Sequence, residues 1–193
     1  MTEISFLSGE VLFAAIWFGI RIITCIRRRK FNLKQELLLL LMYINLAVIL
    51  RMVFYPYEKL NGHIQPLLFD PETVFPLRVN FVPFVHILEY DSLHDTLLNI
   101  IGNVGLFVPS GIVLPVIYKK LNSFAKVTAA GAIMSLTVEV LQLPFSVRAS
   151  DVDDLILNTL GCAIGYLIFT VAKFLINATR NNIVQHTNKG ATK

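Results

Sequence analysis

Five long apolar runs constrain the fold of this chain more than any other feature of its sequence. They cover residues 5–26, 36–55, 95–118, 124–144 and 153–176. Each has about the 20 mostly apolar residues that a helix needs to cross the hydrocarbon core of a bilayer. Backbone polar groups find no water there, so every run is expected to be an α-helix. The sequence therefore predicts an all-α, polytopic membrane bundle with about five transmembrane helices.

The composition supports this prediction. Hydrophobic residues make up 55% of the 193 residues and charged residues only 16%, against roughly 25% charged in a typical soluble domain. The net charge of +4 does not indicate nucleic-acid binding, because the basic residues stand in short clusters between apolar runs. We expect a multi-pass protein of the cell membrane, with membrane lipids as partners and no nucleic acid. Cys25 and Cys162 are expected to stay unpaired.

Three basic segments set the predicted orientation. Most of the 17 Lys and Arg residues lie at 27–34, at 119–126 and in the C-terminal segment from 173 onward. These segments fall on one side of a five-helix bundle, and the positive-inside rule assigns that side to the cytoplasm. The N-terminus is therefore predicted outside and the C-terminus in the cytoplasm.

On this topology the chain divides into three parts. Residues 1–77 hold the first two membrane helices and the start of a long outer loop, and residues 78–176 hold the other three helices. Residues 177–193 form a polar cytoplasmic tail, of which 180–193 is expected to be frayed. The outer loop, 56–94, contains five prolines. Proline at that density favours extended backbone over helix.

Polar residues recur at helical spacing in the last three apolar runs. The stripes are Asp95, Asn99 and Asn103; Glu139 and Gln142; and Asp151, Asp154 and Asn158. Positions three or four apart share one face of a helix, and ionisable residues in membrane spans usually face the bundle interior or water. At about 1.5 Å per residue, the stripes reach similar depths below the predicted outer ends. We expect them to face one another as one polar pocket open to the outside.

The ligand-binding candidates are the stripe residues Asn99, Asn103, Glu139, Gln142, Asp151, Asp154 and Asn158, together with Arg148 in the short outer segment. Arginine can pair with phosphate or carboxylate. Asp153 lies off the stripe and is expected to be solvated. A structural alternative stays open, because hydrogen bonds between helices would explain the amides equally well. They explain the carboxylates less well, since burying several acids together is costly.

Small residues and prolines add two expectations about packing. Gly161 and Gly165 in the last run, and Gly102 and Gly105 in the third, are expected to let helices approach closely. Pro109 and Pro115 are expected to kink the third helix, and the sequence FVPSG at 107–111 to mark a local break at its middle, because proline removes a backbone donor.

Four elements follow in order along the second half of the chain. They are NFVPF (80–84), LLNIIGNVGLFVPSGIVLP (97–115), SLTVEVLQL (135–143) and SDVDDLILNTLGCAIGY (150–166). Together they resemble the VanZ-like family of bacterial membrane proteins, named for a teicoplanin-resistance protein. The matching positions are Asn80, Pro83, Phe84, Asn103, Phe107, Pro109, Gly111, Ser135, Glu139, Gln142, Asp151, Asp154, Asn158 and Gly161. Ser110 replaces the bulkier residue expected there. The resemblance covers about 78–170, so residues 78–176 are predicted to be a VanZ-like domain.

The resemblance implies a role in the bacterial cell envelope. The founding member suggests a link to teicoplanin-type glycopeptide resistance. Such drugs bind cell-wall precursors outside the membrane, where the predicted pocket opens. The ligand expected from the resemblance is a lipid-linked cell-wall precursor, a glycopeptide or another lipid-related molecule, bound without a cofactor. The oligomeric state is left open.

The alternative is a membrane-embedded enzyme acting on a lipid-linked substrate. Glu139, Asp151 and Asp154 could supply general acid–base chemistry or oxygen ligands for a divalent metal, with His86 or His94 nearby. No H-E-x-x-H signature is present, and no Ser-His-Asp arrangement can be argued from the sequence. A transporter or channel is disfavoured for a single chain, because the five runs show no inverted repeat.

Overall fold

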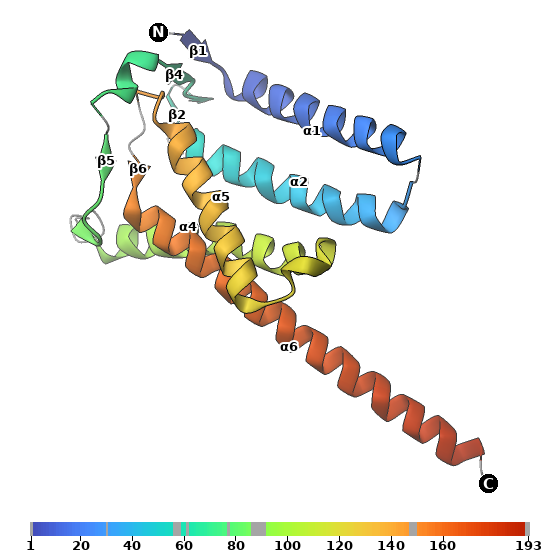
Figure 1. Cartoon of the computed structure of the whole chain (residues 1–193). Helices are drawn as coiled ribbons and strands as arrows, with labels where there is room; N and C mark the ends of the chain where they lie inside the picture. The colour runs from blue at the N-terminus through green and yellow to red at the C-terminus, as the bar shows by residue number, and fades with distance from the viewer. Residues whose placement is uncertain are drawn as a thin grey trace.

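A computed structural model describes residues 2–29, 31–55, 59–60, 62–76, 78–85, 92–146 and 150–191. Its five long helices are α1 (Phe6–Arg28), α2 (Leu33–Phe54), α4 (Leu93–Ile117), α5 (Phe124–Gln142) and α6 (Val152–Ala191). All five are long and apolar enough to cross a membrane. The prediction of an all-α polytopic bundle with about five transmembrane helices is thus confirmed (Figure 1).

Side-chain caps explain where four of the helices begin. Ser5, Asn32, Ser92 and Ser123 each have extended backbone, and each side-chain oxygen accepts a hydrogen bond from the amide three residues later. Such caps satisfy amide donors that a helix start leaves without an internal partner. The second and third apolar runs therefore become helical two or three residues earlier than hydropathy alone predicted.

The last helix is longer than predicted. Hydropathy placed its end near residue 176, with a frayed tail after 180, whereas α6 continues as far as Ala191. The expectation of a frayed tail is therefore wrong. The reason is local, since a helix makes its backbone hydrogen bonds within itself and no proline interrupts residues 177–191. Figure 1 shows this end of α6 running away from the other helices.

The core lies where α6 crosses α4 and α5. Helix α6 packs extensively on both α4 and α5, and α2 packs on α4. Phe107 of α4 and Cys162 of α6 are fully buried at the centre of this packing. Helix α1 packs mainly on α2 and buries none of its own residues completely. It is therefore the peripheral helix of the bundle.

Three glycines make the α4–α6 crossing possible. A Cβ built on Gly165 would overlap the carbonyl oxygen of Val108, and one on Gly161 would overlap that of Val104. Gly111 of α4 meets the Cys162 carbonyl in the same way. The predicted role of Gly161 and Gly165 in close packing is confirmed.

Two other sequence expectations about α4 are wrong. A Cβ at Gly102 or Gly105 would have no described atom within 4 Å, so these glycines do not mediate close packing. They lie on a different side of α4 from Gly111, which the prediction overlooked. The expected local break is also wrong, because α4 continues as one helix through Pro109 and Pro115, whereas the expected kink stays a prediction. Proline inside a membrane helix is tolerated because local adjustments and neighbouring groups can satisfy the freed backbone.

Short strands gather at the end of the bundle where α2 and α5 finish and α4 and α6 begin (Figure 1). Strand β1 (Thr2–Ile4) pairs antiparallel with β4 (Leu67–Phe69), and β2 (Lys59–Leu60) pairs with β3 (His63–Ile64). The pair formed by β5 (Val79–Asn80) and β6 (Ser150–Asp151) is parallel. Short 3-10 turns lie at Pro71–Val74 and Lys119–Leu121. The β5–β6 pair brings the loop before α4 against the start of α6.

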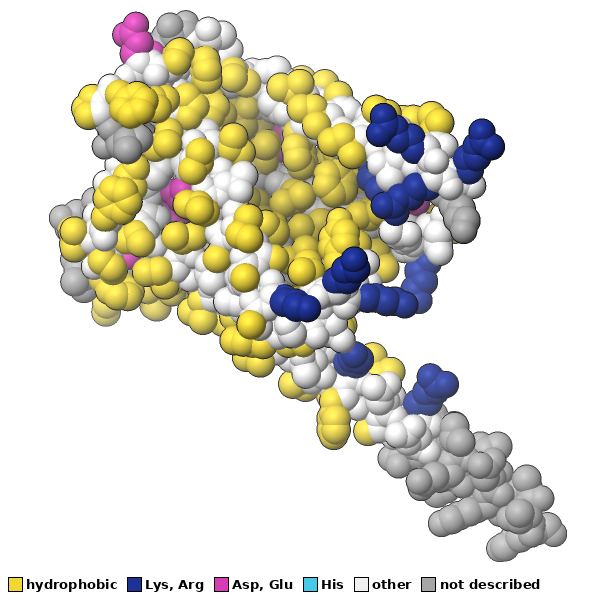
Figure 2. Space-filling model, viewed as in Figure 1, with side chains coloured by type: hydrophobic (Ala, Val, Ile, Leu, Met, Phe, Trp, Pro, Cys, Tyr) yellow, Lys and Arg dark blue, Asp and Glu magenta, His cyan; other side chains and the backbone are white. Residues whose placement is uncertain are grey.

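Charged residues divide between the two ends. Figure 2 shows Lys and Arg side chains gathered around the α1–α2 and α4–α5 turns and along the part of α6 beyond the bundle. Hydrophobic side chains cover most of the rest of this face. This is the charge distribution on which the predicted orientation rests, and the orientation itself stays a prediction. Cys25 and Cys162 are both free, as predicted.

A buried polar cluster at the start of α6

The N-terminus of α6 is held by the side chain of Asp151, which lies just before the helix in β6, and by a side chain from α5. Asp151 Oδ1 accepts a hydrogen bond from the Asp153 amide at 3.0 Å, in the manner of a helix cap. The Asp151 amide in turn donates to Glu139 Oε2 of α5, also at 3.0 Å. A carboxylate is favourable at this position, because the positive end of the helix dipole lies there. Glu139 and Asp151, both predicted site residues, are therefore in direct contact.

Glu139 is the most deeply embedded acid of the predicted stripes. Its side chain is near the end of α5 and the residue is only 6% exposed. Its backbone carbonyl accepts the Ser150 hydroxyl at 2.7 Å, which ties α5 to β6. The second carboxylate oxygen, Oε1, is buried and accepts no hydrogen bond from the part of the chain that the structure describes. Glu139 thus has one oxygen fixed by the α6 N-terminus and one open to a donor.

Asp154 links the same region to α4. Asn103 donates through Nδ2 to Asp154 Oδ1 at 2.7 Å. Asp154 and Asp151 are also the acidic groups that interact electrostatically with Glu139. The structure therefore brings Asn103, Glu139, Asp151 and Asp154 together from α4, α5 and α6.

Asp153 corrects one expectation from the sequence. It was expected to be solvated, yet it is only 3% exposed, and its Oδ1 accepts the Phe84 amide at 2.7 Å. Phe84 has a positive φ of 66°, a conformation that a non-glycine residue adopts infrequently. The expectation failed because the stripe argument compared α6 only with other helices. The loop before α4 contacts the start of α6 and buries Asp153 there.

Asn80 is a second residue of this loop that the candidate set omitted. Its Nδ2 donates to Asp151 Oδ1 at 3.2 Å and to the Val82 carbonyl at 3.2 Å. Its Oδ1 accepts the Val82 amide, which fixes the turn that leads to Phe84. The NFVPF element contained the signal that could have identified this residue. The loop thus closes over the start of α6 through Asn80 and the Phe84 amide.

The remaining amides join helices. Asn158 of α6 donates to the Ser135 hydroxyl of α5 at 3.0 Å, and both residues are fully buried. Gln142 donates to the Val53 carbonyl of α2 at 3.2 Å. These bonds match the structural interpretation of the amides. Nevertheless, Gln142 Oε1 and Asn158 Oδ1 are buried and accept nothing from the described residues.

A second interhelical pair was missed by sequence reasoning. Asn45 of α2 donates to the Leu106 carbonyl at 2.9 Å and accepts the Ser110 hydroxyl of α4. Ser110 is fully buried. This explains why a small hydroxyl residue stands where a bulkier one was expected. In the sequence Asn45 is surrounded by apolar residues and has no polar neighbour at helical spacing. The pattern that identified the other polar residues was therefore absent here.

Several predicted residues lie apart from this cluster. Asp95 is exposed and bonds to Ser92 at the start of α4, where it completes a cap. Asn99 is half-buried, and its side chain makes no hydrogen bond with a described residue. His94 is exposed. Arg148 and His86 lie outside the described residues.

The buried polar atoms around the cluster that lack a described partner are oxygens, which accept hydrogen bonds. Four buried side-chain oxygens in the cluster or within about one helical turn of it have no described partner, and they belong to Glu139, Gln142, Asp153 and Asn158. Buried polar atoms are normally satisfied, so each of these oxygens calls for an explanation. Within the described ranges, no group of three or more His, Cys, Asp and Glu side chains is arranged to hold a metal. The arrangement favours donors from a bound molecule or ordered water.

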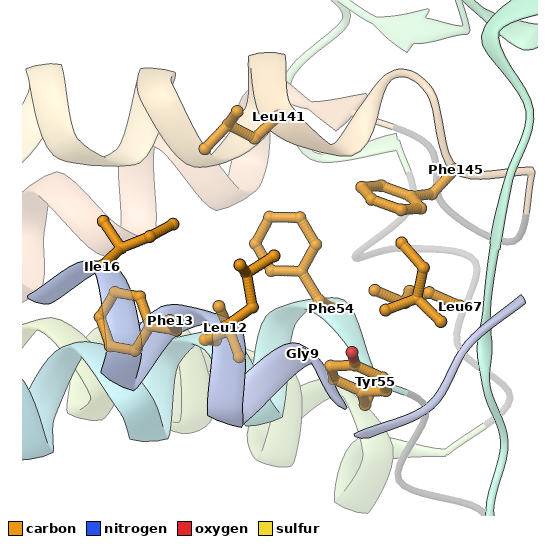
Figure 3. A pocket seen from close by; sticks show the side chains of 11 residues that line it. Gly9, Leu12, Phe13, Ile16, Phe54, Tyr55, Leu67, Leu141 and Phe145 are labelled. Atoms are coloured by element: carbon orange, nitrogen blue, oxygen red, sulfur yellow. The ribbon is translucent and has the colours of Figure 1, made fainter. Parts of the chain in front are cut away.

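An apolar cavity lies close to this end of the bundle. It has a volume of about 360 Å³ and lies between α1, α2 and α5, beside strand β4. Its lining, drawn in Figure 3, is Ile4, Gly9, Leu12, Phe13, Ile16, Leu50, Phe54, Tyr55, Leu67, Leu141 and Phe145. Tyr55 closes one side, where its hydroxyl donates to the Ser5 carbonyl at 3.2 Å. The cavity offers apolar contact almost exclusively.

These features define an integral membrane protein whose helices enclose a buried polar cluster. The chain belongs to the VanZ/LLP1 family, whose model matches residues 37–174. The match begins within α2 and therefore includes more of the chain than the four sequence elements did. Asn45 lies in this added part.

A curated relative supports the assignment. Protein VanZ of Enterococcus faecium is 33% identical over 99 residues, which are 51% of this chain and 56% of that protein. The chain thus aligns with little more than half of that relative's length. No solved structure matches it significantly.

Proposed function

We propose that this protein acts in the bacterial cell membrane by binding a cell-wall-related or lipid-related ligand at the polar cluster. The proposal rests on one observation: four buried side-chain oxygens, of Glu139, Gln142, Asp153 and Asn158, accept nothing from the described residues. Leaving such atoms unsatisfied costs about 1–3 kcal/mol each. A ligand that is rich in N–H and O–H donors would remove this cost.

The ligand class follows from the chemistry and from the family. Glycopeptides and the peptide and sugar parts of cell-wall precursors carry many amide and hydroxyl donors. The predicted orientation would present the cluster to the outer side, where these molecules are found. We therefore propose that the protein contributes to resistance against teicoplanin-type glycopeptides. The apolar cavity between α1 and α5 would suit the lipid portion of a lipid-linked ligand.

Drug susceptibility tests the proposal directly. Deletion of the gene should increase susceptibility to teicoplanin by a larger factor than susceptibility to vancomycin. Expression of the intact protein should restore resistance. Glu139→Gln keeps the size of the side chain but replaces an acceptor oxygen by a donor, so it should fail to restore resistance. Glu72→Gln is the matched control, because Glu72 is exposed in the outer loop. Unchanged susceptibility after deletion, with protein levels verified, would refute the proposal.

A membrane-embedded enzyme is the second proposal. It is favoured by one specific feature, the electrostatic interaction of Glu139 with Asp154 on the neighbouring helix. Paired carboxyl groups can divide acid and base roles between them. Incubation of the purified protein with a lipid-linked precursor, followed by mass spectrometry of the lipid, distinguishes the two proposals. A chemically altered lipid that disappears with Asp154→Asn indicates an enzyme, and an unchanged bound lipid indicates a binding protein.

A further inference from the structure

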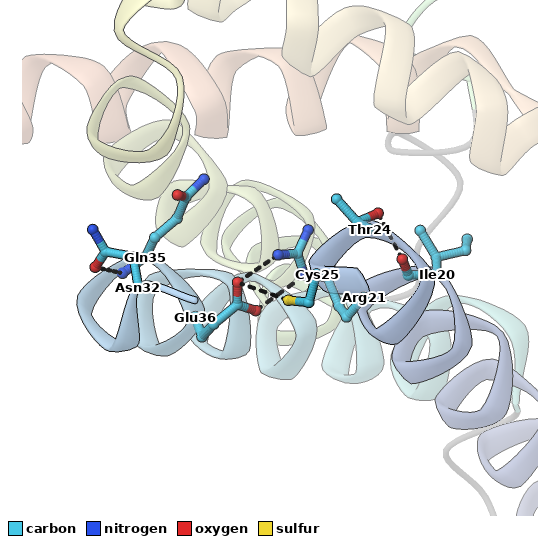
Figure 4. Close-up of polar contacts among 7 residues, drawn as sticks. All are labelled: Ile20, Arg21, Thr24, Cys25, Asn32, Gln35 and Glu36. Atoms are coloured by element: carbon cyan, nitrogen blue, oxygen red, sulfur yellow. Dashed lines mark hydrogen bonds and ion pairs between the residues drawn. The ribbon is translucent and has the colours of Figure 1, made fainter. Parts of the chain in front are cut away.

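A polar cavity lies at the opposite end of the bundle from the polar cluster. It has a volume of about 380 Å³ and lies between the last turns of α1 and the first turns of α2 (Figure 4). Arg21 and Arg28 line it from α1, and Asn32, Gln35 and Glu36 line it from the start of α2. Its polar lining distinguishes it from the apolar cavity near the outer loop.

An ion pair between Arg21 and Glu36 orders one side of this cavity. The Arg21 guanidinium binds the Glu36 carboxylate through two of its nitrogens, and the Nε to Oε2 distance is 3.1 Å. Two-point pairing of this kind holds both groups in a defined geometry. It neutralises Glu36, the one acid that lines the cavity, and leaves Arg21 Nη1 without a hydrogen bond to the described residues.

Two of the other polar side chains of the cavity use their donors inside the protein, because Thr24 donates to the Ile20 carbonyl and the Cys25 thiol to Glu36. The remaining three have donors without a described acceptor. The Arg28 side chain makes no ion pair or hydrogen bond with any residue that the structure describes. Asn32 uses its oxygen to cap α2, where it accepts the Gln35 amide at 3.2 Å, so its side-chain NH₂ group stays available. The Gln35 side chain likewise has no partner among the described residues. A guanidinium and two amide NH₂ groups therefore border one small space.

Exposed residues next to the cavity add further positive charge. Arg27, Arg29 and Lys34 are exposed next to it, and Figure 2 shows the basic side chains that gather at this end of the molecule. The cavity also lies at the end of two membrane-spanning helices, the depth at which lipid headgroups are found. Basic side chains at this depth attract anionic headgroups.

We propose that this cavity binds a phosphate group, which Arg28 holds by charge while the side-chain NH₂ groups of Asn32 and Gln35 donate hydrogen bonds to it. Arg21 is positioned by Glu36 to add one further donor. Phosphate oxygens are strong acceptors, and guanidinium groups match their geometry. The phosphate can come from an anionic phospholipid of the adjacent leaflet or from free phosphate in solution. This site is independent of the polar cluster and of the function proposed for it.

Native mass spectrometry of the full-length protein tests the proposal. The protein in detergent is mixed with phosphatidylglycerol or with zwitterionic phosphatidylcholine, and the retained lipids are counted. We expect phosphatidylglycerol to be retained in preference. Arg28→Gln should weaken its binding about fivefold, the effect expected for one basic residue near an anionic group. Arg27→Gln is the matched control, because it removes the same charge from the neighbouring exposed position that does not line the cavity.

Two further measurements sharpen the test. Gln35→Ala removes a donor without changing the charge, and it should weaken phosphatidylglycerol binding as well. Millimolar inorganic phosphate is added as a competitor: displacement of the lipid identifies free phosphate as a ligand, and no displacement identifies the headgroup. Equal losses with Arg28→Gln and Arg27→Gln would show only diffuse surface charge and overturn the proposal. Equal retention of the two lipids, without binding of inorganic phosphate, would overturn it too.

Discussion

The α4–α6 crossing gives the sharpest test of the packing described above. We predict that Gly165→Ala destabilises the protein, because the added methyl group meets the backbone of α4. Its Cβ would overlap the Val108 carbonyl oxygen and lie 2.9 Å from the Gly111 Cα. Neither contact can be relieved by a side-chain rotation, so the two helices must separate.

The expected cost is at the upper end of the range for overpacking, about 2–3 kcal/mol. Gly105→Ala is the matched control, because a Cβ there would have no described neighbour within 4 Å. That change should be neutral or stabilise α4 by up to about 1 kcal/mol, since alanine is the better helix former. The two variants therefore make the same chemical change with opposite expected signs.

The measurement is the free energy of unfolding in mixed micelles, followed by the helical circular dichroism signal as denaturing detergent is added. The difference between the two variants is the quantity to compare, because it cancels effects common to any glycine substitution. Equal stabilities for Gly165→Ala and Gly105→Ala would refute the described contact between α4 and α6.

Three other predictions concern individual contacts. Asp153→Ala should leave the Phe84 amide without its acceptor and cost about 1–3 kcal/mol; faster proteolysis of the 78–85 loop, with α6 intact, is the readout, and an unchanged cleavage rate would contradict the bond. A double-mutant cycle with Asn158→Leu and Ser135→Ala should give a coupling of about 0.6 kcal/mol, typical of hydrogen bonds between membrane helices; additive effects would argue against that contact. Cys25 is partly exposed and Cys162 fully buried, so a thiol reagent should label only Cys25 in the native protein and both cysteines after denaturation, as peptide mass spectrometry would show.

Much of the polar cluster was accessible from the sequence because helical spacing places residues three or four apart on one face. Asn103, Glu139, Asp151 and Asp154 were selected in this way, and the structure brings them together. Whether they bind a ligand stays a prediction. Asn158 and Gln142 were selected by the same spacing, and their bonds to Ser135 and Val53 connect helices.

The failures have a common physical cause. Asp153 accepts the Phe84 amide, and Asn80 donates to Asp151. Both contacts involve the loop before α4, and spacing along a helix cannot predict where a loop lies. Gly102 and Gly105 have the same composition signal as Gly161 and Gly165, yet the side of α4 that meets α6 carries Gly111 instead. Spacing along one helix shows which residues share a face, but it does not show which face meets a neighbour.

The sequence by itself determined the membrane class, the number of spans and the residues of each polar stripe. These depend on hydropathy and on the helical period, and both are local properties of the chain. Tertiary structure alone decided that Glu139 holds the N-terminus of α6, that Asp153 is buried under a loop, and that glycines at three positions set the α4–α6 distance. Each of these depends on atoms that are distant in sequence, and their proximity is fixed only when the helices and the loop before α4 pack together.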